Sequence, residues 1–245
     1  MITNLQSKYI KSLQNKKGRR EERAFLVEGR KNVLELLESH YEIILVVGTA
    51  AFFAGHDLPW HKWSCAEAPE QKIAALGTFV TNEHALAVAR MQPNTSLEVE
   101  AGDVVLALDD VRDPGNLGTI LRIADWYGIS KIAATATCAE FYNPKAISAS
   151  MGSFTRVKAF YTDLPDFIGE QKTCHTYGTF PEGRDVHGVV FEKPCIIVLG
   201  NESRGINPQL AGMLQHRISI PRYGKAESLN VAVAAAVVCD NLRRG

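Results

Sequence analysis

Apolar and polar positions alternate along this chain with two periods, one typical of helices and one of strands. In the first ninety residues the pattern predicts helices over 7–14, 30–39 and 69–76, and extended apolar stretches over 24–27, 43–47 and 79–89. Residues 92–102 (QPNTSLEVEAG) are polar, rich in turn formers and without helical period. We therefore expect a small α/β domain over 1–91, a linker over 92–102 and a second domain over 103–245.

The second domain shows a regular alternation of buried strands and helices. Strands are expected over 104–108, 131–136, 155–159, 175–179, 195–199 and 217–220, and helices over 117–127, 144–151, 208–214 and 229–243. Strands that are apolar at every position and separated by helices indicate a mostly parallel sheet covered on both faces. Such sheets bind ligands at the carboxyl ends of their strands.

Composition places the chain among globular proteins. Its 245 residues are 46% hydrophobic and 22% charged, enough to bury a sizeable core. Equal numbers of acidic and basic residues, 27 of each, exclude a wholly basic nucleic-acid coat protein and a highly charged disordered chain. The longest apolar run near the C-terminus, 231–239, is far short of the roughly 20 residues that cross a bilayer. With no apolar leader in residues 1–22, a cytoplasmic location and no membrane partner are expected.

The five cysteines are scattered and show neither C-x-x-C spacing nor nearby histidines at ligand spacing. We expect reduced, mostly buried thiols and no metal site. Motifs of other enzyme classes are missing too: there is no G-x-G-x-x-G after a strand, no G-x-x-x-x-G-K-[ST] and no G-x-S-x-G. A dinucleotide enzyme, a P-loop nucleotidase and an α/β-hydrolase therefore lose their usual signatures.

Charge is concentrated at the N-terminal end. Residues 1–31 carry nine basic side chains and three acidic ones, a local charge of +6. One interpretation is a surface for a polyanion such as RNA, because Lys and Arg near phosphates gain from counterion release. The residues that would contact RNA are then Lys16, Lys17, Arg19, Arg20 and Arg30. The alternative, a solvated helix face beside a flexible loop, fits the charge pattern equally well.

Three polar, glycine-rich segments follow expected strands and are candidates for a site: 109–125, 199–206 and 218–234. In the first, Pro114 and Gly115 predict a turn, and Asn116 is a candidate cap for the next helix. Arg122 lies little more than one helical turn further on. Its guanidinium either holds a phosphate or sugar oxygen or pairs with a nearby aspartate as an ordinary surface arginine.

The second segment places Glu202 between Gly200 and Gly205, where the backbone can fold tightly around a ligand. A carboxylate in such a loop either faces that ligand or merely closes the turn. In the third segment Ser228 is a candidate N-cap for an Ala/Val-rich helix, with Leu229 and Asn230 expected in its first turn. Exposed amide groups of such a loop suit the polar edge of an adenine.

Together and in this order, the segments resemble the signature of the SpoU/TrmH branch of the SPOUT RNA methyltransferases, over residues 104–243. The first motif is matched by DPGNLG (113–118) with Arg122, the second by GNESRG (200–205), and the third by Ile220-Pro221, Gly224 and SLNV (228–231). Residues 1–91 are similar, less specifically, to the family's L30e-like substrate-binding domain. In two places the chain departs from the family pattern: Ser148 stands where an Arg is usual, and Arg222 replaces a commonly apolar residue.

The resemblance implies a fold with a trefoil knot in the C-terminal domain, a homodimer, and S-adenosyl-L-methionine as methyl donor. The expected dimer contacts are the helices over 117–127 and 229–243. The residues expected at the cofactor are Gly200, Asn201, Ile220, Ser228, Leu229 and Asn230. The expected catalytic residues are Asn116, Arg122, Glu202, Ser228 and Asn230.

The same resemblance implies methylation of a ribose 2'-hydroxyl in RNA, with ribosomal RNA favoured over transfer RNA. DNA is not expected as a substrate, because it lacks that hydroxyl. Arginine is nearly always protonated, so Arg122 is expected to position phosphate and polarise the hydroxyl, and the proton acceptor is unassigned. The alternative from another class is a catalytically idle RNA-binding or ribosome-assembly protein.

Overall fold

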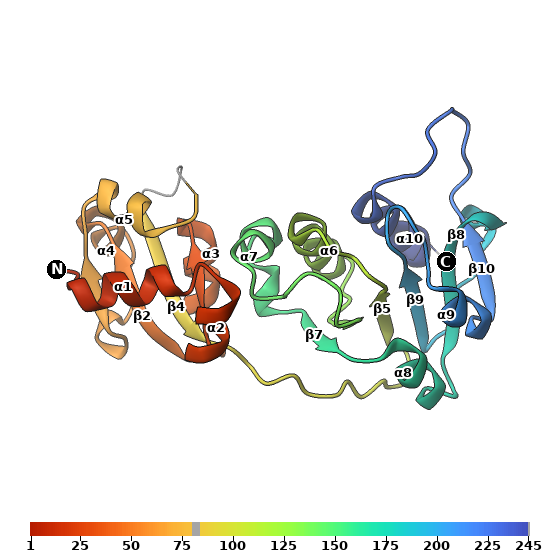
Figure 1. Cartoon of the computed structure of the whole chain (residues 1–245), viewed down its shortest axis with the longest axis horizontal. Coiled ribbons are helices and arrows are strands. Elements are labelled where there is room, and N and C mark those ends of the chain that lie inside the picture. The colour runs from red at the N-terminus through yellow and green to blue at the C-terminus, as the bar shows by residue number, and fades with distance from the viewer. Residues whose placement is uncertain (80–83, 245) are drawn as a thin grey trace. The chain divides into compact units, whose positions relative to one another are not determined.

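The computed structural model describes residues 1–79 and 84–244, which form two compact units (Figure 1). The first unit comprises Met1–Pro93 together with Phe141–Thr155, and the second comprises Asn94–Glu140 and the residues from Arg156 onward. Residues 141–155 were expected within the second domain. They pack with the first unit because the rings of Tyr142 and Phe154 lie 4.5 and 6.0 Å from that of Phe25.

In the first unit, strands β1 (Ala24–Glu28), β2 (Ile43–Gly48), β3 (Cys65–Glu67) and β4 (Ala85–Arg90) form a sheet in the order β1-β4-β2-β3. β4 is antiparallel to both β1 and β2, and β3 is parallel to β2. Of the strand expected over 79–89, residues 80–83 lie outside the described residues. The helical segments are α1 (Asn4–Ser12), α2 (Lys16–Glu22), α3 (Arg30–Leu37), α4 (Ala50–Ala54), α5 (Glu70–Leu76), α7 (Pro144–Ser150) and the 3-10 turns η1 (Trp60–Lys62) and η2 (Ser153–Thr155).

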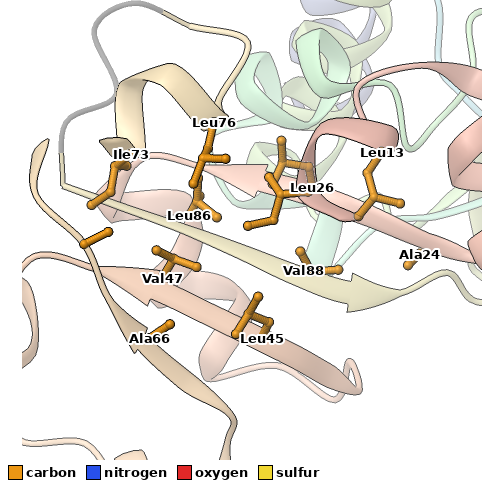
Figure 2. Close-up of a cluster of buried hydrophobic side chains, with 12 residues drawn as sticks. Leu13, Ala24, Leu26, Leu45, Val47, Ala66, Ile73, Leu76, Leu86 and Val88 are labelled. Carbon is orange, nitrogen blue, oxygen red and sulfur yellow. The ribbon is translucent and has the colours of Figure 1, made fainter. Parts of the chain in front are cut away.

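The core of this unit follows the alternation of strand side chains. Every second residue of the sheet points to α1 and α5, where Leu13, directly after α1, and Ile73 and Leu76 of α5 pack against that face (Figure 2). The strand residues in this cluster are Ala24, Leu26, Leu45, Val47, Ala66, Leu86 and Val88. The positions in between, such as Phe25, face the opposite side. The unit is therefore a sheet covered on both faces.

Helix α2 was not expected, because its sequence KKGRREE contains no apolar residue. Local contacts explain it: the Asn15 side chain accepts a hydrogen bond from the Gly18 N–H at 2.8 Å, and Gly18 lies so close to Ser12 that a Cβ would meet its carbonyl oxygen at 2.0 Å. Arg19 is only 2% exposed, and its Nη1 donates to the carbonyls of Leu13 and Gln14 at 3.0 Å. The expectation that Arg19 contacts RNA is therefore wrong; it holds the end of α1.

The second unit is built on a fully parallel sheet in the order β10-β8-β9-β5-β6-β7. This confirms the expected sheet, although the strand predicted over 155–159 begins only at Lys158. The strands are β5 (Val104–Leu108), β6 (Lys131–Ala134), β7 (Lys158–Tyr161), β8 (His175–Asp185), β9 (Cys195–Leu199) and β10 (His216–Ser219). The helices are α6 (Pro114–Trp126), α8 (Leu164–Glu170), α9 (Pro208–Met213) and α10 (Val231–Arg244), with a 3-10 turn η3 (Val186–Gly188).

Both faces of this sheet are buried. Val105 and Ala107 pack with residues of α8 and α9, whereas Leu106 and Leu108, which point the other way, are also fully buried. Helices α6 and α10 pack against each other, and the Arg243 Nε donates to the Tyr127 carbonyl at 2.7 Å. Among the described residues, no helix combines the length and apolar character that crossing a membrane requires.

Most of the segment expected as a linker, residues 94–102, is held to the second unit. The Asn94 side chain binds the edge strand β7 through two hydrogen bonds to Tyr161. Its Nδ2 donates to the Tyr161 carbonyl and its Oδ1 accepts the Tyr161 N–H, each at 2.8 Å. Lys131 donates to the Glu98 carbonyl at 2.7 Å and binds Asp103 at 2.6 Å. The stretch has no regular secondary structure, yet its polar groups fix its path.

The cysteines match the expectation of reduced, mostly buried thiols. All five are free, and only Cys65 is exposed. Burial raises the pKa of Cys195 and of Cys239 to about 12, so both are protonated near neutral pH. These thiols act as small apolar side chains in the core.

Candidate functional site

The three polar segments meet at the carboxyl edge of the parallel sheet. Strand β5 leads into the start of α6, β9 leads into a tight turn, and β10 leads into the long loop before α10 (Figure 1). One side chain from each segment joins a hydrogen-bonded chain. The Asn230 Nδ2 donates to the Asn116 Oδ1 at 2.9 Å, and the Asn116 Nδ2 donates to the Glu202 Oε1 at 2.6 Å. Three of the five expected catalytic residues are thereby brought together.

Asn116 owes its position to Asp113, not to a capping role of its own. The Asp113 side chain caps α6 by accepting the Asn116 backbone N–H at 2.9 Å, and Pro114 occupies the first helical turn. The expected turn at Pro114 and Gly115 is therefore the beginning of the helix. Because the cap is supplied by Asp113, both ends of the Asn116 side-chain amide are available to bind the other two segments.

The turn after β9 presents Glu202. Asn201 and Gly205 exchange two backbone hydrogen bonds of 3.0 and 2.9 Å, and a Cβ on Gly200 would lie 2.4 Å from the Gly205 carbonyl carbon. The Asn201 side chain fills the turn, accepting the Ser203 N–H at 2.9 Å and donating to the Asp110 carbonyl at 2.9 Å. Gly200 and Asn201 thus shape this turn, with Glu202 inside it.

Two consecutive aspartates after β5 support the site, and sequence reasoning missed them. Asp109 is buried and accepts the Asn207 N–H at 2.6 Å, and burial raises the pKa of its carboxyl. Asp110 binds Arg112 at 2.7 Å, which lowers the pKa of that carboxyl. Their position directly after a strand expected to be buried was the sequence signal that could have identified them. Their role is to tie the turn after β9 to the end of β5.

The third segment corrects a predicted cap. Helix α10 begins at Val231, and the Asn230 Oδ1 accepts the N–H groups of Ala232 and Val233 at 2.9 and 3.3 Å. Asn230 therefore occupies the capping position predicted for Ser228. Ser228 is exposed and makes no hydrogen bond with any residue that the structure describes. The network thus joins Asn116, Glu202 and Asn230 without it.

The loop between β10 and α10 offers peptide groups to a ligand. Within the described part of the chain, residues 220–229 make no backbone-to-backbone hydrogen bonds, and this loop projects away from the sheet (Figure 1). Leu229 keeps 48% of its surface exposed. The Ala226 carbonyl accepts a hydrogen bond from the Arg222 side chain at 3.3 Å. The other peptide groups of the loop, next to apolar side chains, fit the polar edge and the faces of an adenine. The residues present therefore fit an adenosine-bearing cofactor at Gly200, Ile220 and Leu229.

Arg122 lies apart from the bonded chain. It is exposed on α6, six residues after Asn116 and so about 120° around the helix axis from it. The surface ion pair with Asp125 is not formed, because Asp125 binds Arg156 at 2.9 Å. Among residues 1–79 and 84–244, none forms a hydrogen bond or ion pair with the Arg122 guanidinium. Its five N–H donors are thus available to an oxyanion outside this chain.

Comparison with known proteins is consistent with this geometry. The sequence profile of the SpoU rRNA methylase family matches residues 103–240, more than half of the chain. The chain belongs to this family. A second profile, described as an MRM3-like substrate binding domain, matches residues 4–87.

Relatives resemble this SpoU-family protein along its whole length. The 23S rRNA (guanosine(2553)-2'-O)-methyltransferase RlmP of Bacillus subtilis is 30% identical, covering 98% of this chain and 96% of the relative. A TrmH-family structure from Porphyromonas gingivalis superposes with a TM-score of 0.87 at 36% identity, covering both chains completely. A Sinorhizobium meliloti rRNA methyltransferase with AdoMet bound superposes with a TM-score of 0.86 at 29% identity, covering 100% of this chain and 96% of the other.

The SpoU-family protein carries its remaining candidate RNA contacts on the first unit. Lys16, Lys17, Arg20 and Arg30 are exposed, unlike Arg19. Lys17 lies 3.8 Å from Glu21 on the same helix, a contact that solvent screens. These four cations fall within the region matched by the substrate-binding profile. They are well placed on the surface for a polyanion.

Proposed function

We propose that this protein transfers a methyl group from S-adenosyl-L-methionine to a ribose 2'-hydroxyl of ribosomal RNA. The observation that carries the proposal is the chain from Asn230 through Asn116 to Glu202, which joins all three family motifs at the carboxyl edge of the sheet. The named function of the Bacillus relative and the cofactor in the Sinorhizobium structure support the reaction and the methyl donor. The rival, an idle RNA-binding protein with the same fold, is distinguished from the enzyme by the presence or absence of methyl transfer.

The residues of the site have distinct tasks in this reaction. When bound, the cofactor supplies a methyl group already activated by its sulfonium charge. The peptide groups of residues 220–229 and the turn at Gly200 hold the adenosine, while Asn116 and Asn230 keep the loops in register. Arg122 binds an RNA phosphate and polarises the ribose hydroxyl, which must be aligned behind the methyl group. Ser228 is proposed to contact cofactor or RNA from the exposed loop.

Radiolabelled S-adenosylmethionine tests this function directly. The purified protein is incubated with the labelled cofactor and total RNA from a strain lacking the protein, and labelled RNA is sized and mapped. Label at one 2'-O position of ribosomal RNA is the expected result. Label in transfer RNA would show that transfer RNA is the substrate. RNA binding without label in naked RNA, ribosomal subunits or assembly intermediates would favour the idle RNA-binding protein.

The basic surface should contribute to RNA affinity through phosphate contacts. Replacing Lys16, Lys17 and Arg20 with glutamine should weaken binding and lower the slope of log K against log salt by about 2, since each single-strand phosphate contact contributes roughly 0.7. Cofactor affinity should not change. Filter binding over a salt series measures this, with Lys72, Lys172 and Lys193 replaced together as a matched control of exposed cations. An unchanged slope would leave the cluster as a solvated helix face.

We also propose a homodimer formed through α6 and α10. These helices carry exposed apolar side chains that water disfavours: Trp126 on α6 is 82% exposed, and Val233 on α10 is 50% exposed. The trefoil knot and the cytosolic location that the sequence led us to expect are kept as predictions.

Charged residues in place of Trp126 and Val233 should dissociate the proposed dimer. The double variant Trp126→Glu, Val233→Glu should sediment as a folded monomer, because it would bury unpaired carboxylates in the contact. Val190→Glu is the matched control, since Val190 is 71% exposed but lies between β8 and β9. Analytical ultracentrifugation distinguishes the two; a double variant that still forms the dimer would place the contact elsewhere.

A further inference from the structure

Arg30 and a group of aromatic rings lie at one end of the strands of the sheet in the first unit. Strands β1 and β2 are both antiparallel to β4, so their carboxyl ends lie at the same edge. Helix α3 begins there with Arg30, and α4 and η1 follow β2. The Arg30 Nε lies 3.2 Å from the Nε2 of His56, which follows α4. The topology thus brings together residues 26 positions apart.

His56 orients the arginine. Its Nδ1 lies 2.7 Å from the Phe52 carbonyl, which can only accept, so Nδ1 carries the hydrogen and Nε2 accepts the Arg30 Nε–H. This bond uses only the Nε of Arg30, so the two terminal nitrogens of its guanidinium remain as donors. They make no hydrogen bond with any residue in the described ranges, and Arg30 is exposed. The bond to His56 therefore fixes a fork of donors that faces solvent.

Aromatic rings lie close to His56, the partner of Arg30. Trp60 donates its Nε1–H to the His56 carbonyl at 3.2 Å, and its ring centroid lies 4.9 Å from that of Phe53 and 6.0 Å from that of Trp63. All three rings are partly exposed. We call Phe53, His56, Trp60 and Trp63 the ring cluster. Each of these rings therefore keeps part of its surface accessible to a stacking ligand.

Two further cations are neighbours of these residues in the sequence. Lys31 follows Arg30 on α3, and Lys62 ends η1 beside Trp63; both are exposed. Asp57 is the acidic residue next to His56 in the sequence. Aromatic faces interleaved with cations match the chemistry of unpaired nucleotides, whose bases stack on rings while their phosphates bind arginine. A duplex would present phosphates but keep its base faces hidden.

We propose that the ring cluster and Arg30 bind an unpaired stretch of the substrate RNA, with a phosphate on the guanidinium of Arg30 and a base stacked on Trp60. His56 is a positioning residue for Arg30. The inference rests on the proposed function only for the identity of the ligand as substrate RNA. It defines the form of RNA that the first unit selects, a single-stranded segment.

Binding of the full-length protein to two labelled RNAs tests the proposal: an unstructured 12-nucleotide strand and a 12-base-pair duplex. Trp60→Leu should weaken binding of the single strand about tenfold, the effect of losing one stacked base, and change duplex binding less than twofold. Trp60→Phe is the matched control, because it keeps a ring and loses the same Nε1 hydrogen bond. Equal losses in both tryptophan variants, or none in either, would overturn the stacking role.

The arginine and its support have separate readouts. Arg30→Gln and His56→Ala should both lower single-strand affinity, whereas His56→Gln, which restores an acceptor near Nε2, should recover most of it. Lys62→Gln, at an exposed position, should lower affinity without any risk to folding. Stacking is observed independently as quenching of tryptophan fluorescence in a Trp126→Phe background, which removes the tryptophan outside the cluster. Absence of quenching on saturation with single strand would refute the proposal.

The outcomes separate this inference from the proposed function. Methyl transfer with RNA affinity unchanged in Trp60→Leu and Arg30→Gln would keep the function and reject the surface. Single-strand binding that depends on these residues without any methyl transfer would keep the surface and reject the function. If the ring cluster serves a protein partner and not RNA, saturating the protein with single-stranded RNA should leave the tryptophan fluorescence unchanged. That result counts against the proposal.

Discussion

Replacing Arg122 with alanine should lower the rate of methyl transfer about 10²- to 10⁴-fold and leave folding and cofactor affinity unchanged. The side chain makes no hydrogen bond or ion pair with any described residue, so its removal breaks no contact within the chain. What is lost is the cation proposed to align phosphate and polarise the ribose hydroxyl, and groups with that task contribute about that factor. Single-turnover kinetics with saturating RNA measures the rate, and equilibrium dialysis measures cofactor affinity.

Lysine at this position is the informative control. Arg122→Lys keeps the charge and loses the planar fork of donors, so it should recover only part of the rate if bidentate phosphate binding matters. Turnover retained in Arg122→Ala would remove this residue from the mechanism.

The geometry of α6 also makes a subunit-exchange experiment decisive. Arg122 points about 120° away from Asn116 around the helix, so it serves either its own site or that of a partner in a dimer. An Arg122→Ala protein is mixed with a Glu202→Ala protein and the subunits are allowed to exchange. If Arg122 acts across the dimer, half of the dimers contain one intact site and activity returns to about a quarter of the native value. If it acts within its own subunit, no activity returns.

The sequence allowed the elements with strong apolar patterns to be predicted closely. The predicted bounds of β5 and β9 match the structure, because these strands are buried at every position and carry an unbroken apolar run. The convergence of three distant segments also followed, since parallel strands end at one edge. Helix α2 did not, because it is stabilised by Asn15, by the close approach at Gly18 and by burial of Arg19, contacts that leave no apolar period.

Capping and packing partners were harder to predict, for a physical reason. Asp113 and Asn116 are both good caps three residues apart, as are Ser228 and Asn230 two residues apart. The choice depends on which side chain is drawn into tertiary contacts: Asn116 binds Glu202, which leaves the cap to Asp113. Similarly, the pattern over residues 141–155 does not show which unit they join, whereas contacts such as those of Tyr142 and Phe154 with Phe25 assign them to the first unit.

The second large effect is expected from Asn116→Asp. The substitution keeps the oxygen that accepts from Asn230 but places a second carboxylate oxygen where the amide donates to Glu202, 2.6 Å away. Like charges at that distance repel strongly, so the turn at 200–205 should shift and both cofactor affinity and turnover should fall about 100-fold or more. The fold should persist, because an acidic residue in the first turn of α6 suits the positive end of the helix.

The sign of the pH dependence provides a test that general damage to the site would not pass. In Asn116→Asp the two carboxyls can share one proton, and the shared proton restores a hydrogen bond between them. The activity of the variant relative to the native protein should therefore rise as the pH falls through the range where the pair takes up this proton. At higher pH, where both carboxyls are ionised, the relative activity should be low. A constant ratio of variant to native activity across pH would show that repulsion with Glu202 is not the cause.

A charge-swapped pair separates the bond from the charge. In the double variant Asn116→Asp, Glu202→Gln, the new amide at 202 can donate to the new carboxylate at 116, so the hydrogen bond is restored in the opposite direction. Cofactor affinity should recover, because it depends on the turn and the α10 loop being held in register. If turnover recovers as well, Glu202 acts by positioning alone. If turnover stays low while the cofactor binds, the carboxylate at 202 takes part in the reaction, and it becomes the leading candidate for the proton acceptor that Arg122, as a permanent cation, cannot be.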